Sequence, residues 1–110
     1  MLNGLWTAEF GSSTGIFGGG TAVFRDGSIW GGDATYFYVG EYTLTGEAFK
    51  ATLKISPFID GAESVFKTVG KELILNLEGT LLDADHAIAQ RHPKDMPGFN
   101  FGAKLTRRVS

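Results

Sequence analysis

Residues 18–33 read GGGTAVFRDGSIWGGD and contain the strongest local fold signal in the chain. Two short runs that alternate apolar and polar residues flank Asp26-Gly27, and glycines follow at both outer ends. Asp-Gly between alternating runs predicts a β-hairpin, because a type I′ turn needs positive φ at both central residues. The outer glycines indicate places where strands bend sharply, bulge or approach one another closely. The stretch therefore predicts a tightly turned antiparallel sheet.

The rest of the chain repeats this pattern of short strand and tight turn. The clearest alternation lies at 48–55, and 58–70 give no clear pattern, with a short strand at 64–69 favoured over a helical turn. About eight consecutive strands without a strong amphipathic helix predict an all-β, antiparallel up-and-down barrel, with a two-sheet sandwich as the alternative. The expected strands cover residues 5–10, 21–25, 28–30, 36–44, 48–55, 71–81, 86–90 and 99–106.

Length and charge limit the function classes. The 110 residues predict a single domain, 1–110, with its own core. A formal net charge of −2 argues against nucleic-acid binding by phosphate neutralisation, and Arg107-Arg108 are expected at a solvated strand end. The absence of cysteine excludes disulfides and thiolate sites. The sequence begins without a signal-peptide pattern and contains no apolar run of membrane-helix length, so we expect a cytoplasmic protein without a membrane partner.

The residues that could carry metal or imidazole chemistry have simpler explanations. His86 and His92 are six residues apart, about 20 Å along a strand, which is too far for one metal ion. Surface histidines are therefore expected. Asp83 and Asp85 lack the further oxygen ligands of a calcium loop, and turn chemistry explains both. No metal or cofactor is expected here.

The candidate carboxylate pair and the glycine-rich stretches also have simpler explanations. Glu41 and Glu47 flank a turn, and nothing beside them indicates a raised pKa, so they are expected to be solvated. The glycines at 18–20 and 31–32 are not followed by a helix, so they do not form a phosphate loop. No cluster has the composition of a catalytic site, and we expect no enzyme activity.

The residue pattern of the strand expected at 36–44 predicts an interaction surface. Tyr36, Phe37, Tyr38 and Val39 are apolar on both faces of the strand at 36–44, which a solvated antiparallel strand would not be. One face can line the core. The other face must be covered, and a second copy of the chain is the simplest cover, so these four residues are the predicted homodimer face.

The interior of an eight-stranded barrel is filled by side chains or holds one small ligand. Trp6, Trp30, Tyr36, Tyr38 and Phe101 are aromatic residues of a kind that lines pockets, although plain core packing is the more common role. The residues predicted to line an interior cavity are apolar and lie on the expected inward faces: Trp6, Phe10, Phe24, Phe49, Leu53, Leu75 and Phe101.

Four segments together resemble a known family. They are NGLWTAEF at 3–10, FGGGTAV at 17–23, DGSIWGGD at 26–33 and YFYVG at 36–40. The sequence resembles the GrlR-like family, named for a negative regulator of type III secretion in attaching-and-effacing enteric bacteria. The similarity is strongest in the first half and continues more weakly to the C-terminus. Its most specific part is the Gly-Gly-Asp step followed by the aromatic strand.

The resemblance implies a small lipocalin-like barrel that forms a homodimer and is not an enzyme. The family prototype represses by binding its transcriptional activator through an acidic Glu-Asp-Glu-Asp patch. The matching turn here is Leu44-Thr45-Gly46-Glu47, with one acid instead of four, so repression of that activator is not carried over. We expect a homodimeric protein-interaction module with a regulatory role. The alternative is a carrier or sensor of a small apolar, lipid-like ligand in the barrel.

Overall fold

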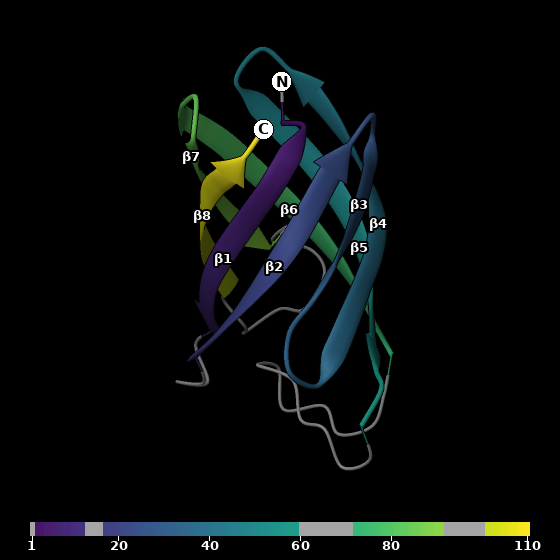
Figure 1. The fold of residues 1–110 in the computed structure, drawn as a ribbon. Helices are drawn as coiled ribbons and strands as arrows, with labels where there is room; N and C mark the ends of the chain where they lie inside the picture. The colour runs from purple at the N-terminus through teal and green to yellow at the C-terminus, as the bar shows by residue number, and fades with distance from the viewer. Residues whose placement is uncertain (1, 13–16, 60–71, 92–100) are drawn as a thin grey trace.

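A computed structural model of the chain describes residues 2–12, 17–59, 72–91 and 101–110. Each strand pairs antiparallel with the next, and the last strand pairs with the first, so the sheet closes into a barrel (Figure 1). This confirms the predicted all-β, eight-stranded up-and-down barrel over the sandwich. The short strand predicted at 64–69 lies outside the described residues. The strands are β1 (Gly4–Ser12), β2 (Phe17–Arg25), β3 (Ser28–Gly32), β4 (Tyr36–Thr45), β5 (Ala48–Pro57), β6 (Leu73–Asp83), β7 (His86–Arg91) and β8 (Phe101–Val109).

The hairpin that joins β2 to β3 has the predicted turn chemistry. Asp26 and Gly27 both have positive φ, 48° and 89°, as a type I′ turn requires. Asn3 fixes this turn to the start of the chain, because its Nδ2 donates to Asp26 Oδ1 at 3.1 Å. The Asp26 backbone N–H donates back to Asn3 Oδ1 at 3.0 Å. The turn therefore closes one end of the barrel together with the N-terminal segment.

The glycines around this hairpin serve close approach between strands. Residues 18–20 pair with β1 without a register shift, and the irregular pairings lie elsewhere, at Leu5/Trp6 and Leu81/Asp83. A Cβ on Gly31 would lie 2.1 Å from the Thr21 carbonyl oxygen. Of the three roles expected for the outer glycines, the structure thus supports close packing and contradicts bulges.

Strand alternation separates the interior from the outer surface. On β4 and β5 the inward side chains include Tyr36, Phe49 and Ala51, each at most 5% exposed, and their strand neighbours face outward. The buried core cluster consists of Leu2, Trp6, Phe24, Ile29, Phe49, Ala51, Ala87 and Ala89.

Both termini lie at the same end of the barrel (Figure 1), and buried side chains close this end. Trp6 is completely buried, and its Nε1 donates to the Leu2 carbonyl at 2.8 Å. The Arg107 guanidinium lies 4.9 Å from the Trp6 ring centroid and donates from Nη1 to the Asn3 carbonyl at 2.7 Å. Its Nε donates to the Ala84 carbonyl at 3.1 Å, in the β6–β7 turn.

The predicted solvated position of Arg107 is therefore wrong. Its side chain is only 12% exposed, and it forms an ion pair with Asp85 at 3.3 Å. The physical reason is strand period: Arg107 continues the inward series Phe101, Ala103 and Leu105 on β8. Arg108 alternates outward and is exposed, as expected for both arginines.

Candidate functional site

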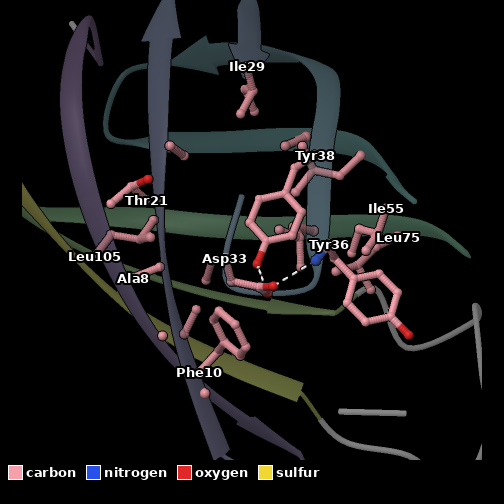
Figure 2. Close-up of a pocket in the computed structure, with 18 of the residues that line it drawn as sticks. Ala8, Phe10, Thr21, Ile29, Asp33, Tyr36, Tyr38, Ile55, Leu75 and Leu105 are labelled. Atoms are coloured by element: carbon pink, nitrogen blue, oxygen red, sulfur yellow. Dashed lines mark hydrogen bonds between the residues drawn. The ribbon is translucent and has the colours of Figure 1, made fainter. Parts of the chain in front are cut away.

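A cavity of about 370 Å³ occupies the barrel interior on the side away from the closed end. Figure 2 shows side chains from several strands pointing into it. The cavity exists because many inward positions carry small residues, whose volume does not fill an eight-stranded barrel. These small residues on the wall are Ala8, Gly18, Ala22, Ala51, Ala89 and Ala103.

The wall includes most of the residues that the sequence placed there. Phe10, Phe24, Phe49, Leu53, Leu75 and Phe101 line the cavity. Trp6 does not, because it is buried in the closed end beneath Leu2 and Arg107. Of the other aromatic candidates, Tyr36 and Tyr38 line the cavity, whereas Trp30 points outward and is 49% exposed.

One carboxylate faces this apolar cavity. Asp33 follows the Gly-Gly step in the loop between β3 and β4, and its Oδ1 accepts backbone N–H groups from Thr35 at 2.9 Å and from Tyr36 at 2.8 Å. The Asp33 backbone N–H donates to the Tyr36 carbonyl at 3.0 Å, and the Phe58 N–H donates to the Thr35 carbonyl at 3.0 Å. These bonds hold the loop, so the carboxylate has a fixed position at the cavity wall.

The second oxygen of Asp33 accepts the hydroxyl of Tyr38, which reaches it from the inward face of β4 (Figure 2). Burial raises the pKa of Tyr38 well above its ordinary value, and the hydrogen bond to Asp33 and the charge of Asp33 raise it further. Tyr38 therefore remains protonated and keeps its single proton directed at the carboxylate.

Gly20 makes room for this pair. A Cβ at Gly20 would lie 3.1 Å from the Tyr38 hydroxyl oxygen and 2.9 Å from the Gly32 carbonyl oxygen. Any larger residue at this position on β2 would therefore press on the pair and on the backbone beside it. The glycine triplet thus has a local steric role at the site.

The charge on the described cavity wall is negative. Among the lining residues that the structure describes, there is no lysine, arginine or histidine, and Asp33 is the single carboxylate. Arg91 is buried at the end of β7, two residues beyond Ala89, but it is not one of the lining residues and has an interaction of its own. The described cavity wall is therefore apolar except for one acidic hydrogen-bonding site, the Asp33 carboxylate with the Tyr38 hydroxyl.

The other candidate groups do not gather into a site. His86 is exposed, and its Nδ1 lies 2.8 Å from Asp83 Oδ1 in the β6–β7 turn. Hydrogen bonds from the Asp85 N–H and from His86 lower the pKa of Asp83. His92 lies outside the described residues. Within the described ranges no three His, Cys, Asp or Glu side chains come together as a metal site.

The remaining predicted positions lie on the outside of the barrel. Glu41 is exposed on β4, and Glu47 is exposed in the β4–β5 turn, where its carbonyl accepts the Leu81 N–H at 2.7 Å. Within the turn that matches the acidic patch of the resembled family, Leu44 is partly buried against the core. Thr45, Gly46 and Glu47 are exposed.

The predicted dimer face divides between the two sides of β4. Tyr36 is 3% exposed and Tyr38 points into the cavity, so neither can contact a second chain across the outer surface. Phe37 and Val39 do face outward, 45% and 46% exposed. The division follows from the two-residue period of a strand.

Strand pairing aligns Val39 with other exposed apolar residues. Leu5 pairs with Val109 and Val23, Val23 pairs with Trp30, and Trp30 pairs with Val39. With strands about 4.8 Å apart, these cross-strand neighbours form one continuous line roughly 19 Å long. We call this line, Val109, Leu5, Val23, Trp30 and Val39, the outer apolar row.

Sequence reasoning missed the Asp33–Tyr38 pair. A signal was present, since Asp33 and Tyr38 both lie in the Gly-Gly-Asp and aromatic segment that is the most specific part of the family resemblance. The missing step was register. Tyr38 pairs with Gly31, two residues before Asp33, and this pairing brings the phenol to the carboxylate.

No helix in the described part of the chain is long and apolar enough to cross a bilayer. No model of a known protein family matches the sequence, and no curated protein matches it significantly.

Proposed function

We propose that this protein is a non-enzymatic binder that holds one small apolar ligand inside the barrel, as a carrier or sensor. The observation that carries this proposal is the cavity of about 370 Å³. Its volume lies within the range of roughly 300–1,000 Å³ that is typical of small-molecule sites, and such sites are mostly apolar with a few fixed polar groups. The cavity wall and the Asp33–Tyr38 pair have this composition.

Binding is tested with the neutral fluorescent probe N-phenyl-1-naphthylamine, together with native mass spectrometry of the purified protein. We expect saturable fluorescence enhancement by the wild type. Ala103→Leu places three further carbon atoms in the cavity and should weaken binding about tenfold, because a filled cavity excludes the probe. Ala48→Leu is the matched control, since Ala48 is exposed on β5. No enhancement and no co-purified mass would contradict the proposal.

The second candidate function is a homodimeric interaction module with a regulatory role, as the family resemblance implies. The outer apolar row supports it, because soluble monomers rarely expose long contiguous apolar surfaces. A contiguous row of exposed apolar side chains suits a two-fold contact, in which the same surface is used by both copies. A transcriptional regulator as protein partner belongs to this candidate, although the β4–β5 turn has one acid.

Sedimentation velocity at micromolar concentration tests the dimer. Trp30→Glu places a charge in the middle of the row and should shift the protein to monomer, because the charge would have to be desolvated in the contact. Ile88→Glu is the matched control, since Ile88 is 46% exposed on β7 and lies outside the row. A monomeric wild type, or equal loss of dimer in both variants, would contradict this candidate.

A further inference from the structure

We propose that the cavity selects apolar ligands that carry a hydrogen-bond donor, namely alcohols or amines, and disfavours carboxylates and carbonyl compounds that only accept. The inference rests on the proposed ligand-binding function and specifies its ligand class. The selecting groups are Asp33 and Tyr38 on the cavity wall (Figure 2).

The donors and acceptors of the pair decide which ligand head group it can bind. A phenol has one proton, and the Tyr38 proton is already given to the Asp33 carboxylate. What the pair offers a ligand is therefore acceptor capacity, at the Tyr38 oxygen and at Asp33 Oδ2. A ligand hydroxyl or amine can donate to these atoms without breaking any bond. A ligand that only accepts must first displace Tyr38 from a charge-assisted hydrogen bond.

The other hydroxyls on the wall do not change this count. The Thr35 hydroxyl is directed at Asp33 Oδ1, at 3.4 Å. Tyr36 has an interaction of its own, and Thr21 is exposed on the outward face of β2, where it alternates with the inward Ala22. The Asp33–Tyr38 pair is thus the polar point at which a ligand head group can dock among the described lining residues.

The charge of Asp33 also acts on the ligand head group. A ligand carboxylate beside Asp33 would place two negative groups together in an apolar space, where like charges repel more strongly than in water. No cationic side chain on the described wall offsets this repulsion. An ammonium group, in contrast, is attracted to the same position. Charge and hydrogen bonding therefore favour the same ligand class.

The Asp33–Tyr38 pair does not need to rearrange when a ligand binds. Backbone N–H groups of Thr35 and Tyr36 hold Asp33 Oδ1, and the inward face of β4 holds the Tyr38 ring. A polar group that is fixed before binding costs little entropy when a ligand arrives. The selectivity should therefore be a property of the folded barrel itself.

The experiment compares ligands that differ only in the head group, using displacement of N-phenyl-1-naphthylamine from the full chain. Undecan-2-ol and undecan-2-one share one carbon skeleton and are both neutral, and decylamine and decanoate add charge of either sign. We expect undecan-2-ol to bind about tenfold more tightly than undecan-2-one, the effect of one hydrogen bond to a charged group. Decylamine should exceed decanoate by a larger factor.

Two variants locate the selectivity in the pair. Asp33→Asn keeps an oxygen for the Thr35 and Tyr36 N–H groups, and its amide can donate to the Tyr38 oxygen, which frees the Tyr38 proton for a ligand. The preference should then reverse toward undecan-2-one. Tyr38→Phe removes the one donor of the pair and leaves Asp33 Oδ2 as a free acceptor, so the alcohol-to-ketone ratio should rise. Tyr42→Phe is the matched control, because its hydroxyl donates to Asn3 at the closed end and does not line the cavity.

Each outcome has a distinct meaning. If neither the probe nor any of the four compounds binds, the proposed function fails. If the probe binds but undecan-2-one equals undecan-2-ol, or decanoate binds as well as decylamine, the binding function stands and the inference about ligand class is overturned. A preference for decanoate that is unchanged in Asp33→Asn would assign the head group to another residue and overturn it as well.

Discussion

Tyr38 provides the most direct test of the pair without a ligand. Because its folded-state pKa is raised, the folded protein gains stability from this group below its ordinary pKa of 10.0, and this gain falls as the pH rises above that value. Wild type and Tyr38→Phe should therefore show equal tyrosinate absorbance near pH about 11 while folded, and differ by one tyrosine once denatured. Ionisation of Tyr38 in the folded barrel near its ordinary pKa would contradict the buried hydrogen bond.

The same experiment separates burial from the contribution of Asp33. Asp33→Asn removes the negative charge but leaves Tyr38 in its inward position, so the pKa of Tyr38 should fall and still remain above its ordinary value. Burial is the largest cause of the shift, and this ranking predicts the partial effect. Tyr42→Phe serves as the control for Tyr38→Phe. It removes a different tyrosine, so it separates the effect of losing Tyr38 from the effect of losing any one tyrosine.

Arg107 and Arg108 give a matched pair of substitutions. Arg107→Ala removes hydrogen bonds to the carbonyls of Asn3 and Ala84 and the contact with the Trp6 ring, so we expect the free energy of unfolding to fall by about 2–3 kcal/mol. Arg107→Lys should recover only part of this loss, because an ammonium lacks the planar fork. Chemical denaturation measures both variants.

Arg108→Ala is the control, since Arg108 is exposed and such a change usually costs within about 0.5 kcal/mol. Equal losses of unfolding free energy at both positions would show that only the charge of the side chain matters.

The contrast between the two arginines also shows what can be predicted for single residues from the sequence. Period-two alternation places Phe49 and Leu75 inward correctly, and the same period places Arg107 inward. Its charge argued for the surface, and only the closed end, built from distant segments, reverses that choice.

Within the strands, two glycines should behave oppositely. A Cβ at Gly40 would lie 2.1 Å from the Thr52 carbonyl oxygen and 3.0 Å from Leu53 Cα, so β4 can approach β5 only with glycine there. Gly40→Ala should destabilise the barrel by about 1–3 kcal/mol, because backbone atoms must shift. Gly102→Ala meets no atom within 4 Å and should be neutral or stabilise by up to about 1 kcal/mol.

Thermal unfolding of the two variants checks this contrast. If Gly40→Ala left the stability unchanged, close approach of β4 to β5 would not be the reason for that glycine.

The sequence predicts the strands and turns well where the signal is local. Asp26-Gly27 is enough for the β2–β3 turn, because positive φ is a property of two adjacent residues. It does not show that Gly31 packs against Thr21 instead of bulging, because that depends on how tightly the closed barrel brings strands together.

For the whole barrel, closure follows from consecutive hairpins, and the hollow interior follows from small inward residues such as Ala51 and Ala103. Alternation predicts the closure, but it leaves open whether the interior is filled or hollow, because that depends on how the inward side chains pack in the closed barrel. The position of the acidic hydrogen-bonding site could not be predicted, because Asp33 is in a loop and meets Tyr38 only through the register of β3 with β4. One sheet layer thus carries the cavity on its inner face and the outer apolar row on the other.

The two surfaces should act independently. No residue of the outer apolar row lines the cavity, although Val39 directly follows Tyr38 on β4. Trp30→Glu should therefore abolish dimerisation and leave the alcohol-to-ketone ratio unchanged, while Tyr38→Phe should do the reverse. The double variant should show the sum of the two effects, as expected for sites without shared contacts. Sedimentation velocity and probe displacement on the same four proteins measure this.

The thermodynamic coupling between ligand binding and dimerisation tests whether the two surfaces are independent. If ligand binding and dimerisation were coupled, saturating undecan-2-ol would change the dimer dissociation constant by the same factor by which dimerisation changes ligand affinity. We expect both factors to be close to one, because the proposed ligand would contact inward side chains and the partner would contact outward ones. Equal factors far from one would instead identify a barrel that changes shape on binding. Such a protein would act as a sensor, with β4 as the element common to both surfaces.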